Sequence, residues 1–86
     1  MSEWKAIVET IVEQARIVLD MPDLSPDEDF LAAGLDSVLA VELADRVTEA
    51  IGVDIPVAFL YTHPTAGHLA ELATEMSGED GDVRGA

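Results

Sequence analysis

Ser37 is the residue of this chain whose type and setting are best suited to chemistry. It follows Asp36 directly and Gly34 by three positions, and the residues from Val38 to Ile51 predict one amphipathic helix. We therefore expect Ser37 on the first turn of that helix, with its hydroxyl facing solvent. This geometry favours a hydroxyl that becomes modified over one that attacks a substrate. The sequence thus predicts a protein that carries a group on Ser37 and is not itself an enzyme.

A nucleophilic role for Ser37 finds little support in the surrounding residues. A hydrolase nucleophile elbow needs a glycine two residues before and two residues after the serine, on a strand-to-helix turn. Here Gly34 lies three residues before Ser37, Leu39 lies two after it, and no strand precedes it. His63 and His68 are the two histidines that could act as a base. Both are predicted near the start of the distant last helix, where we interpret them as structural polar residues.

The acids that precede Ser37 do not predict a metal site. Asp23, Asp27, Glu28 and Asp29 lack the ligand spacing and the central glycine of an EF-hand loop. We interpret them as a solvated acidic surface, with loose cation binding as the alternative. A phosphate-binding loop is excluded because no lysine lies near Gly34 and the neighbouring acid opposes an anion. No residue is therefore assigned as a metal ligand.

The composition predicts an apolar interior inside a strongly negative surface. The chain has 86 residues, is 49% hydrophobic and carries a formal charge of −14. Nucleic acid and anionic membranes would repel such a surface, so we expect neither as a partner. A basic protein surface is the natural complement, and a monomer is expected for so charged a domain. The four basic residues are Lys5, Arg16, Arg46 and Arg84.

Cysteine is absent, so the chain itself supplies no disulfide, thiolate metal site or reactive thiol. Its first residues predict the beginning of a helix and not a signal peptide, and no apolar run approaches membrane-spanning length. These features predict a soluble protein in the cytoplasm.

Hydrophobic periodicity predicts an all-α fold, a small four-helix bundle with three longer helices and one short one. The first helix is expected over residues 3–19, and a long loop over 20–36 should be tied to the core by Phe30, Leu31 and Leu35. Within this loop, Ser25 and Glu28 have the spacing of a capping box around a single turn.

The helix that follows the loop should be capped by Asp36 and end at Gly52. Its predicted buried positions are Val41, Leu43, Ala44, Val47 and Ile51. A short helical segment is expected over 57–61. The last helix should begin after Thr65, which is its predicted N-cap, and end at Gly78. The predicted domain spans 1–78, and 79–86 should form a flexible acidic tail or the stub of a linker.

The chain resembles a known family of proteins. The motif Gly34-Leu35-Asp36-Ser37 and the apolar helix after it are similar to the phosphopantetheine attachment segment of acyl carrier proteins. The similarity continues, in order and spacing, over residues 4–76. Its later landmarks are Ile55-Pro56, Phe59-Leu60-Tyr61 and His63-Pro64-Thr65. The Leu-Asp-Ser form followed by His-Pro-Thr is more similar to carriers of polyketide synthases than to fatty-acid carriers.

The resemblance implies both a cofactor and a function. A phosphopantetheinyl transferase would move 4'-phosphopantetheine from coenzyme A to the Ser37 hydroxyl, and Asp36 would contribute to recognition by that enzyme or to orienting its metal. The thiol of the arm would hold acyl or polyketide intermediates as thioesters and present them to the enzymes of a polyketide pathway. The carrier itself would have no catalytic activity.

The resemblance also implies a docking surface on the outward side of the helix after Ser37. We expect Val38, Glu42, Asp45 and Glu49 there, facing basic patches on the transferase, a ketosynthase, an acyltransferase or another pathway enzyme. Arg46 interrupts these acids. The contacts should weaken with salt.

Several alternatives remain open at the level of sequence. A peptidyl or aminoacyl carrier of a nonribosomal synthetase shares the chemistry, although such carriers more often have a second glycine where Leu35 stands. A non-carrier acidic helical adaptor, with Ser37 inert or phosphorylated, fits the composition. The nearness of Met1 to the first helix favours a free-standing carrier, but an excised synthase domain would look the same. The sequence leaves open the acyl cargo, the product, the partner enzymes and any sequestering of the acyl chain within the bundle.

Overall fold

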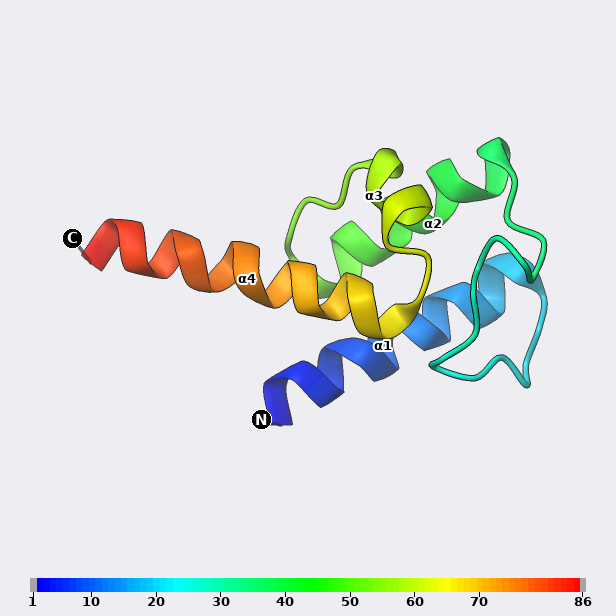
Figure 1. Ribbon diagram of the computed structural model, residues 1–86, viewed down its shortest axis with the longest axis horizontal. Coiled ribbons are helices and arrows are strands. Elements are labelled where there is room, and N and C mark those ends of the chain that lie inside the picture. The colour runs from blue at the N-terminus through cyan, green and yellow to red at the C-terminus, as the bar shows by residue number, and fades with distance from the viewer. Residues whose placement is uncertain (1, 86) are drawn as a thin grey trace.

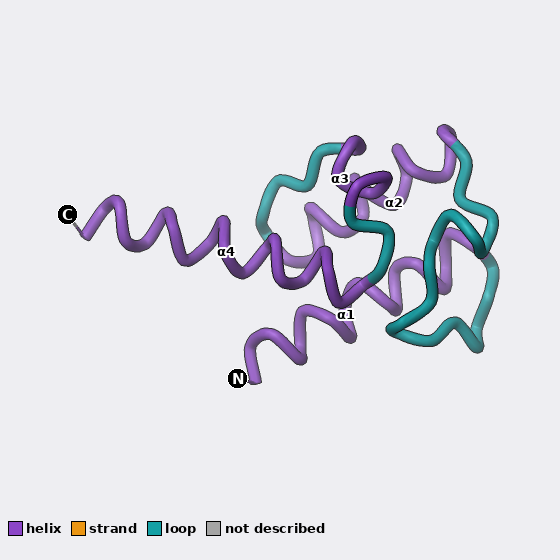
Figure 2. Tube along the Cα trace, in the orientation of Figure 1, coloured by secondary structure: helices purple, strands orange, loops and turns teal. Residues whose placement is uncertain are grey.

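The computed structural model describes residues 2–85, with side chains described for 4–76. It contains four helices, which are α1 (Ser2–Leu19), α2 (Ser37–Ile51), α3 (Val57–Thr62) and α4 (Ala66–Gly85) (Figure 1). Over these residues the chain forms helices and loops and no strand (Figure 2). The predicted all-α fold, with three longer helices and one short one, is confirmed.

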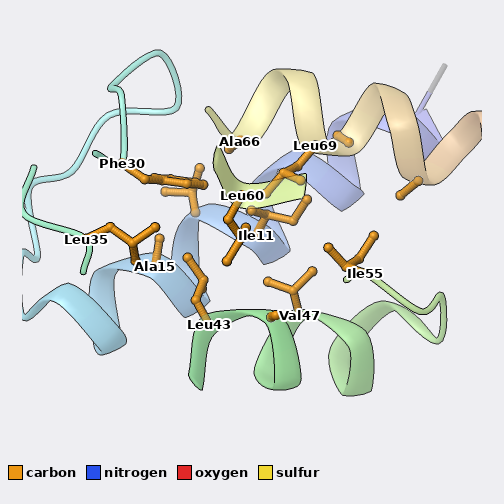
Figure 3. Close-up of a cluster of buried hydrophobic side chains, with 14 of the residues drawn as sticks. Ile11, Ala15, Phe30, Leu35, Leu43, Val47, Ile55, Leu60, Ala66 and Leu69 are labelled. Atoms are coloured by element: carbon orange, nitrogen blue, oxygen red, sulfur yellow. The ribbon is translucent and has the colours of Figure 1, made fainter. Parts of the chain in front are cut away.

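The core lies where α1 meets α2 and α4, with α3 packed against α2. Its members come from all four helices and from the segment between α1 and α2 (Figure 3). Among the side chains of residues 4–76, every buried one is hydrophobic. Of the loop residues expected to reach the core, Phe30 and Leu35 do, whereas Leu31 is 39% exposed, so its predicted anchoring role is wrong. The largest fully buried side chains are Phe30, Ile11, Leu24, Leu43, Leu60, Leu69 and Val47.

A left-handed residue ends α1 and turns the chain into the segment 20–36. Asp20 has a φ of 56°, a conformation that favours glycine or asparagine. The N–H groups of Asp20 and Met21 donate to the carbonyls of Ile17 and Arg16, at 3.3 and 3.0 Å. These two bonds form a Schellman motif, which satisfies carbonyls that the helix end would otherwise leave free.

Arg16 fastens the segment 20–36 to α1. Its Nε and Nη2 atoms both donate to the carbonyl oxygen of Leu24, at 3.0 and 2.8 Å. The Leu24 side chain is itself fully buried, so this contact fixes an anchor of the segment in the core. This role of Arg16 could not be predicted from the sequence, because a hydrogen bond from a side chain to a distant carbonyl has no local sequence pattern.

We expect Arg16→Met to lower the free energy of unfolding by about 1–3 kcal/mol, since it leaves the Leu24 carbonyl without its charged donor. Arg16→Lys is the matched control, because lysine keeps the charge and can restore one of the two bonds. Urea denaturation of the three proteins measures the difference. If methionine and lysine at position 16 cost the same, the hydrogen bonds to Leu24 do not contribute to stability.

Two details of the sequence-based helices were wrong. Val41 was placed in the buried stripe of α2, but it is 50% exposed, and the buried residues of α2 are Ala40, Leu43, Ala44 and Val47. The small Ala40 occupies the position closest to the core, which turns Val41 toward solvent.

The last helix does not end at Gly78, because α4 continues to Gly85. A glycine within a helix costs about 1 kcal/mol relative to alanine but does not break it, and no proline follows. That residues 79–86 act as a flexible tail or linker stub stays a prediction. Within the described part of the chain, none of the helices is both long and apolar enough to cross a membrane.

Candidate functional site at the start of α2

The segment that leads into Ser37 is built from a capped turn. The Asp29 carboxylate accepts from the N–H groups of Leu31 and Ala32, at 2.7 and 3.2 Å. The Ala33 N–H then donates to the Asp29 carbonyl at 3.0 Å, as in one turn of helix. Asp29, interpreted from sequence as part of a solvated acidic surface, therefore also opens this turn by capping it.

Gly34 closes the same turn. Its φ of 112° lies where side chains are rarely tolerated. Its N–H donates to the Leu31 carbonyl at 3.2 Å, and the Leu35 N–H donates to the Phe30 carbonyl at 3.0 Å. This is a second Schellman motif, with Gly34 in the left-handed position. An added Cβ at Gly34 would meet no atom within 4 Å, so the need for glycine comes from the backbone conformation and not from crowding.

Asp36 then caps α2, as predicted. Its backbone is extended, and its Oδ1 accepts from the Leu39 N–H at 2.9 Å. The Ala40 N–H donates to the Asp36 carbonyl at 2.8 Å and closes the first turn. Ser37 is consequently the first residue of α2, and it is exposed.

The segment before Ser37 is also joined to the connection between α3 and α4. The fully buried Phe30 donates its N–H to the Pro64 carbonyl at 2.7 Å. Thr65 caps α4, because its Oγ1 accepts from the His68 N–H at 3.3 Å. The His-Pro-Thr landmark seen in the sequence thus supplies both an acceptor for the loop before Ser37 and the start of α4.

The exposed face of α2 carries the four residues expected to recognise partners. All four are exposed, and successive members lie three or four positions apart along α2, opposite the buried stripe. They are Val38, Glu42, Asp45 and Glu49. Val38 is the most open of the large hydrophobic residues, at 73% exposure. Val41 joins it on the same side of the helix at a spacing of three. Val41 could not be assigned to this face from the sequence, because apolar residues on a helix usually face the core.

Arg46 lies at the edge of this face that borders α1. Its Nε is 3.4 Å from Oε2 of Glu42, one turn earlier, and its Nη1 is 3.4 Å from Oε1 of Gln14 in α1. Both side chains of the Arg46–Glu42 pair are about half exposed. The acids expected at the docking surface are therefore not electrostatically equivalent.

The other residues considered for chemistry lie away from Ser37 or are engaged elsewhere. His63 Nδ1 is 2.8 Å from Thr62 Oγ1, its ring stacks at a tilt on Phe59, and His68 lies in the first turn of α4. Over the described residues, no three or more acids and histidines converge as metal ligands would. Phe59 packs against the core, whereas Tyr61 is 43% exposed.

The structure is thus a small helical bundle that presents an exposed serine as the first residue of a capped helix. The chain belongs to the family whose model is described as "Phosphopantetheine attachment site", which matches residues 5–73. This confirms the resemblance to acyl carrier proteins and identifies 4'-phosphopantetheine as the cofactor of the domain.

Individual comparisons agree with this family. The chain is 39% identical over 88 residues to "Phenolphthiocerol synthesis polyketide synthase type I Pks15/1" of Mycobacterium bovis, covering 93% of this chain and 4% of that protein. It is also 39% identical over 70 residues to "5-methyl-1-naphthoate synthase" of Streptomyces sahachiroi, covering 80% of this chain and 4% of that protein. The chain thus spans a small fraction of the length of these curated relatives.

A solved structure shares the fold. It is described as BlmI, a type-II acyl-carrier-protein from Streptomyces verticillus involved in bleomycin biosynthesis, and it aligns with a TM-score of 0.82. The alignment covers 87% of this chain and 90% of that one, at 21% identity. It confirms the helical architecture in which Ser37 is displayed.

Proposed function

We propose that this protein is an acyl carrier that holds acyl or polyketide intermediates on a phosphopantetheine arm attached to Ser37. The observation that carries the proposal is the exposed Ser37 as the first residue of α2, within a domain of the phosphopantetheine attachment family. The Ser37 hydroxyl forms no hydrogen bond with the other described residues, so its oxygen is free to react. When bound, the arm supplies the thiol that this cysteine-free chain lacks.

The loading step is a phosphoryl transfer from coenzyme A, catalysed by a phosphopantetheinyl transferase. The Ser37 oxygen forms a bond to the phosphorus that carries pantetheine, and the bond from that phosphorus to the bridging oxygen of coenzyme A breaks. The adenosine bisphosphate leaves, and the serine proton passes to a base of the transferase. The carrier's own contribution is positioning, because Asp36, Gly34 and the turn capped by Asp29 fix where Ser37 lies.

The residues around Ser37 are compatible with the attached phosphodiester. A helix N-terminus favours negative charge through its free N–H groups and its dipole. The Asp36 side chain already accepts from the Leu39 N–H. The N–H groups of Ser37 and Val38 come before the first intrahelical hydrogen bond, so they have no acceptor within the helix. The Asp36 charge opposes the phosphodiester, which supports a role for Asp36 in recognition by the transferase as well as in capping.

We further propose that the exposed face of α2 docks on the transferase and on enzymes such as a ketosynthase or an acyltransferase. The acids on this face and the net charge of −14 support partners with basic surfaces. The carrier itself performs no chemistry in this scheme. Tethering raises the effective concentration of the bound intermediate at each partner's active site.

The proposal predicts that the purified chain, incubated with coenzyme A, Mg²⁺ and a broad-specificity phosphopantetheinyl transferase, gains the mass of one phosphopantetheine. Ser37→Ala should show no gain, and intact mass spectrometry measures both. Ser25→Ala, at another exposed serine, is the matched control and should load like the wild type. No gain in the wild type, or a gain that persists in Ser37→Ala, contradicts the assignment.

A further inference from the structure

The acids on the exposed face of α2 differ in their neighbours. Within the described residues, Asp45 and Glu49 have no cation within ion-pairing distance, whereas Glu42 faces the guanidinium of Arg46 at 3.4 Å. Arg46 is the one basic residue of α2. It lowers the formal charge contributed by the exposed face from −3 to −2, and it does so only at the edge that borders α1.

Arg46 is held at that edge by two contacts. The pairing with Glu42 is local to α2, at the i,i+4 spacing that favours helical ion pairs. The contact of Nη1 with Oε1 of Gln14 at 3.4 Å crosses to α1. The exposed face is therefore asymmetric, with a neutralised edge toward α1 and a negative, partly apolar portion that includes Asp45.

We infer that Arg46 masks Glu42, so that basic partner enzymes dock on Asp45 and Glu49. This inference rests on the docking role proposed above and refines it. The occupant is a partner with basic side chains opposite Asp45 and Glu49 and an apolar contact for Val38 and Val41. Opposite the neutral pair of Glu42 and Arg46, the partner needs no charged group.

Exposed charges at a docking surface act mainly on the rate at which two proteins associate. An exposed ion pair contributes little to stability, yet a charge at the rim of an interface changes the rate of association with an oppositely charged partner. Removing the positive charge of Arg46 leaves the Glu42 carboxylate unpaired. This unpaired charge should accelerate docking on a basic surface at low ionic strength, and the gain should disappear as salt screens it.

The test uses the full chain, coenzyme A, Mg²⁺ and a phosphopantetheinyl transferase with a basic docking surface, and measures kcat/KM for loading. Arg46→Gln should raise kcat/KM by about two- to five-fold at low salt and by much less at high salt. Lys5→Gln is the matched control, because it removes the same charge near the start of α1, and this end of α1 lies far from the start of α2 (Figure 1). Its effect should be clearly smaller.

A double variant tests whether Glu42 and Arg46 act as a neutral unit. Glu42→Gln combined with Arg46→Gln keeps the net charge of the wild type, so it should lose the gain in kcat/KM that Arg46→Gln shows alone. Asp45→Asn should lower kcat/KM by about two- to five-fold with or without Arg46. Equal effects of Arg46→Gln and Lys5→Gln, slower loading by Arg46→Gln, or a kcat/KM of the double variant far below that of the wild type would each overturn the inference.

The same samples separate this inference from the proposed function. The mass gain after long incubation reports whether Ser37 is loaded at all, and every variant with intact Ser37 should show the same gain. The rates report how the partner docks. Full loading with unchanged rates refutes the role of Arg46 alone, whereas an absence of loading in the wild type refutes the carrier function.

Discussion

Phe30→Ala is expected to lower the free energy of unfolding by about 3–5 kcal/mol, because it removes a fully buried ring and leaves a cavity in the core. Phe30 lies among Ala66, Leu69 and Leu60, where the segment before Ser37 meets α4 (Figure 3). A domain of 86 residues has a total stability of roughly 4–13 kcal/mol, so this loss is a large fraction of it.

Thermal and urea denaturation followed by circular dichroism measure the effect of the change at Phe30. Leu31→Ala is the matched control, since the neighbouring side chain is exposed and its loss should cost less than about 1 kcal/mol. Phe30→Leu keeps most of the apolar volume and provides a measurable variant if the alanine protein does not fold. A cost for Phe30→Ala no greater than for Leu31→Ala would show that the loop is not anchored by this ring.

Asp36→Asn and Asp36→Ala are expected to differ in stability and to agree in loading. Asparagine can still accept from the Leu39 N–H and cap α2, so its stability should stay near that of the wild type. Alanine loses the cap, which costs about 0.5–2 kcal/mol. Neither variant has the carboxylate that we propose the transferase recognises. We expect loading to fall roughly 10–100-fold in both, the range found when a group that orients a metal ligand is removed.

The comparison of the two Asp36 variants separates capping from recognition. Stability is measured by thermal denaturation and loading by the initial rate of mass gain with coenzyme A and the transferase. If Asp36→Asn loads as fast as the wild type while Asp36→Ala loads slowly, Asp36 acts only through the cap, and its predicted role in recognition is wrong.

The helices could be predicted because their signals are local. Periodic apolar residues gave α1, and Asp36 and Gly52 marked the ends of α2 through capping chemistry that depends on a few neighbouring residues. Ser37 could be singled out for the same reason, since its place on the helix follows from the cap before it. The capping box at Ser25 and Glu28 formed in part: the Ser25 N–H donates to Glu28 Oε1 at 3.2 Å, but Ser25 Oγ accepts from the Asp27 N–H at 3.1 Å.

What the sequence did not reveal depends on contacts between distant residues. The bond from Arg16 to the Leu24 carbonyl and the bond from Phe30 to the Pro64 carbonyl join positions that no local pattern connects. The outward orientation of Val41 depends on which face of α2 meets α1, and a valine and a small alanine side by side give an ambiguous stripe. The asymmetry of the acidic face needed the geometry of Arg46 for the same reason.

The exposed valines of α2 limit the apolar contribution to how long the carrier stays on any one enzyme. Fully burying a valine side chain contributes about 1.5 kcal/mol, so Val38 and Val41 together contribute at most about 3 kcal/mol, or a factor of roughly 150 in the dissociation constant. Differences in affinity between related complexes appear mainly in the dissociation rate. Larger side chains at these two positions would lengthen the time that the carrier stays bound to each enzyme. For a carrier that serves several active sites in turn, release from each enzyme would then limit the rate of the whole cycle.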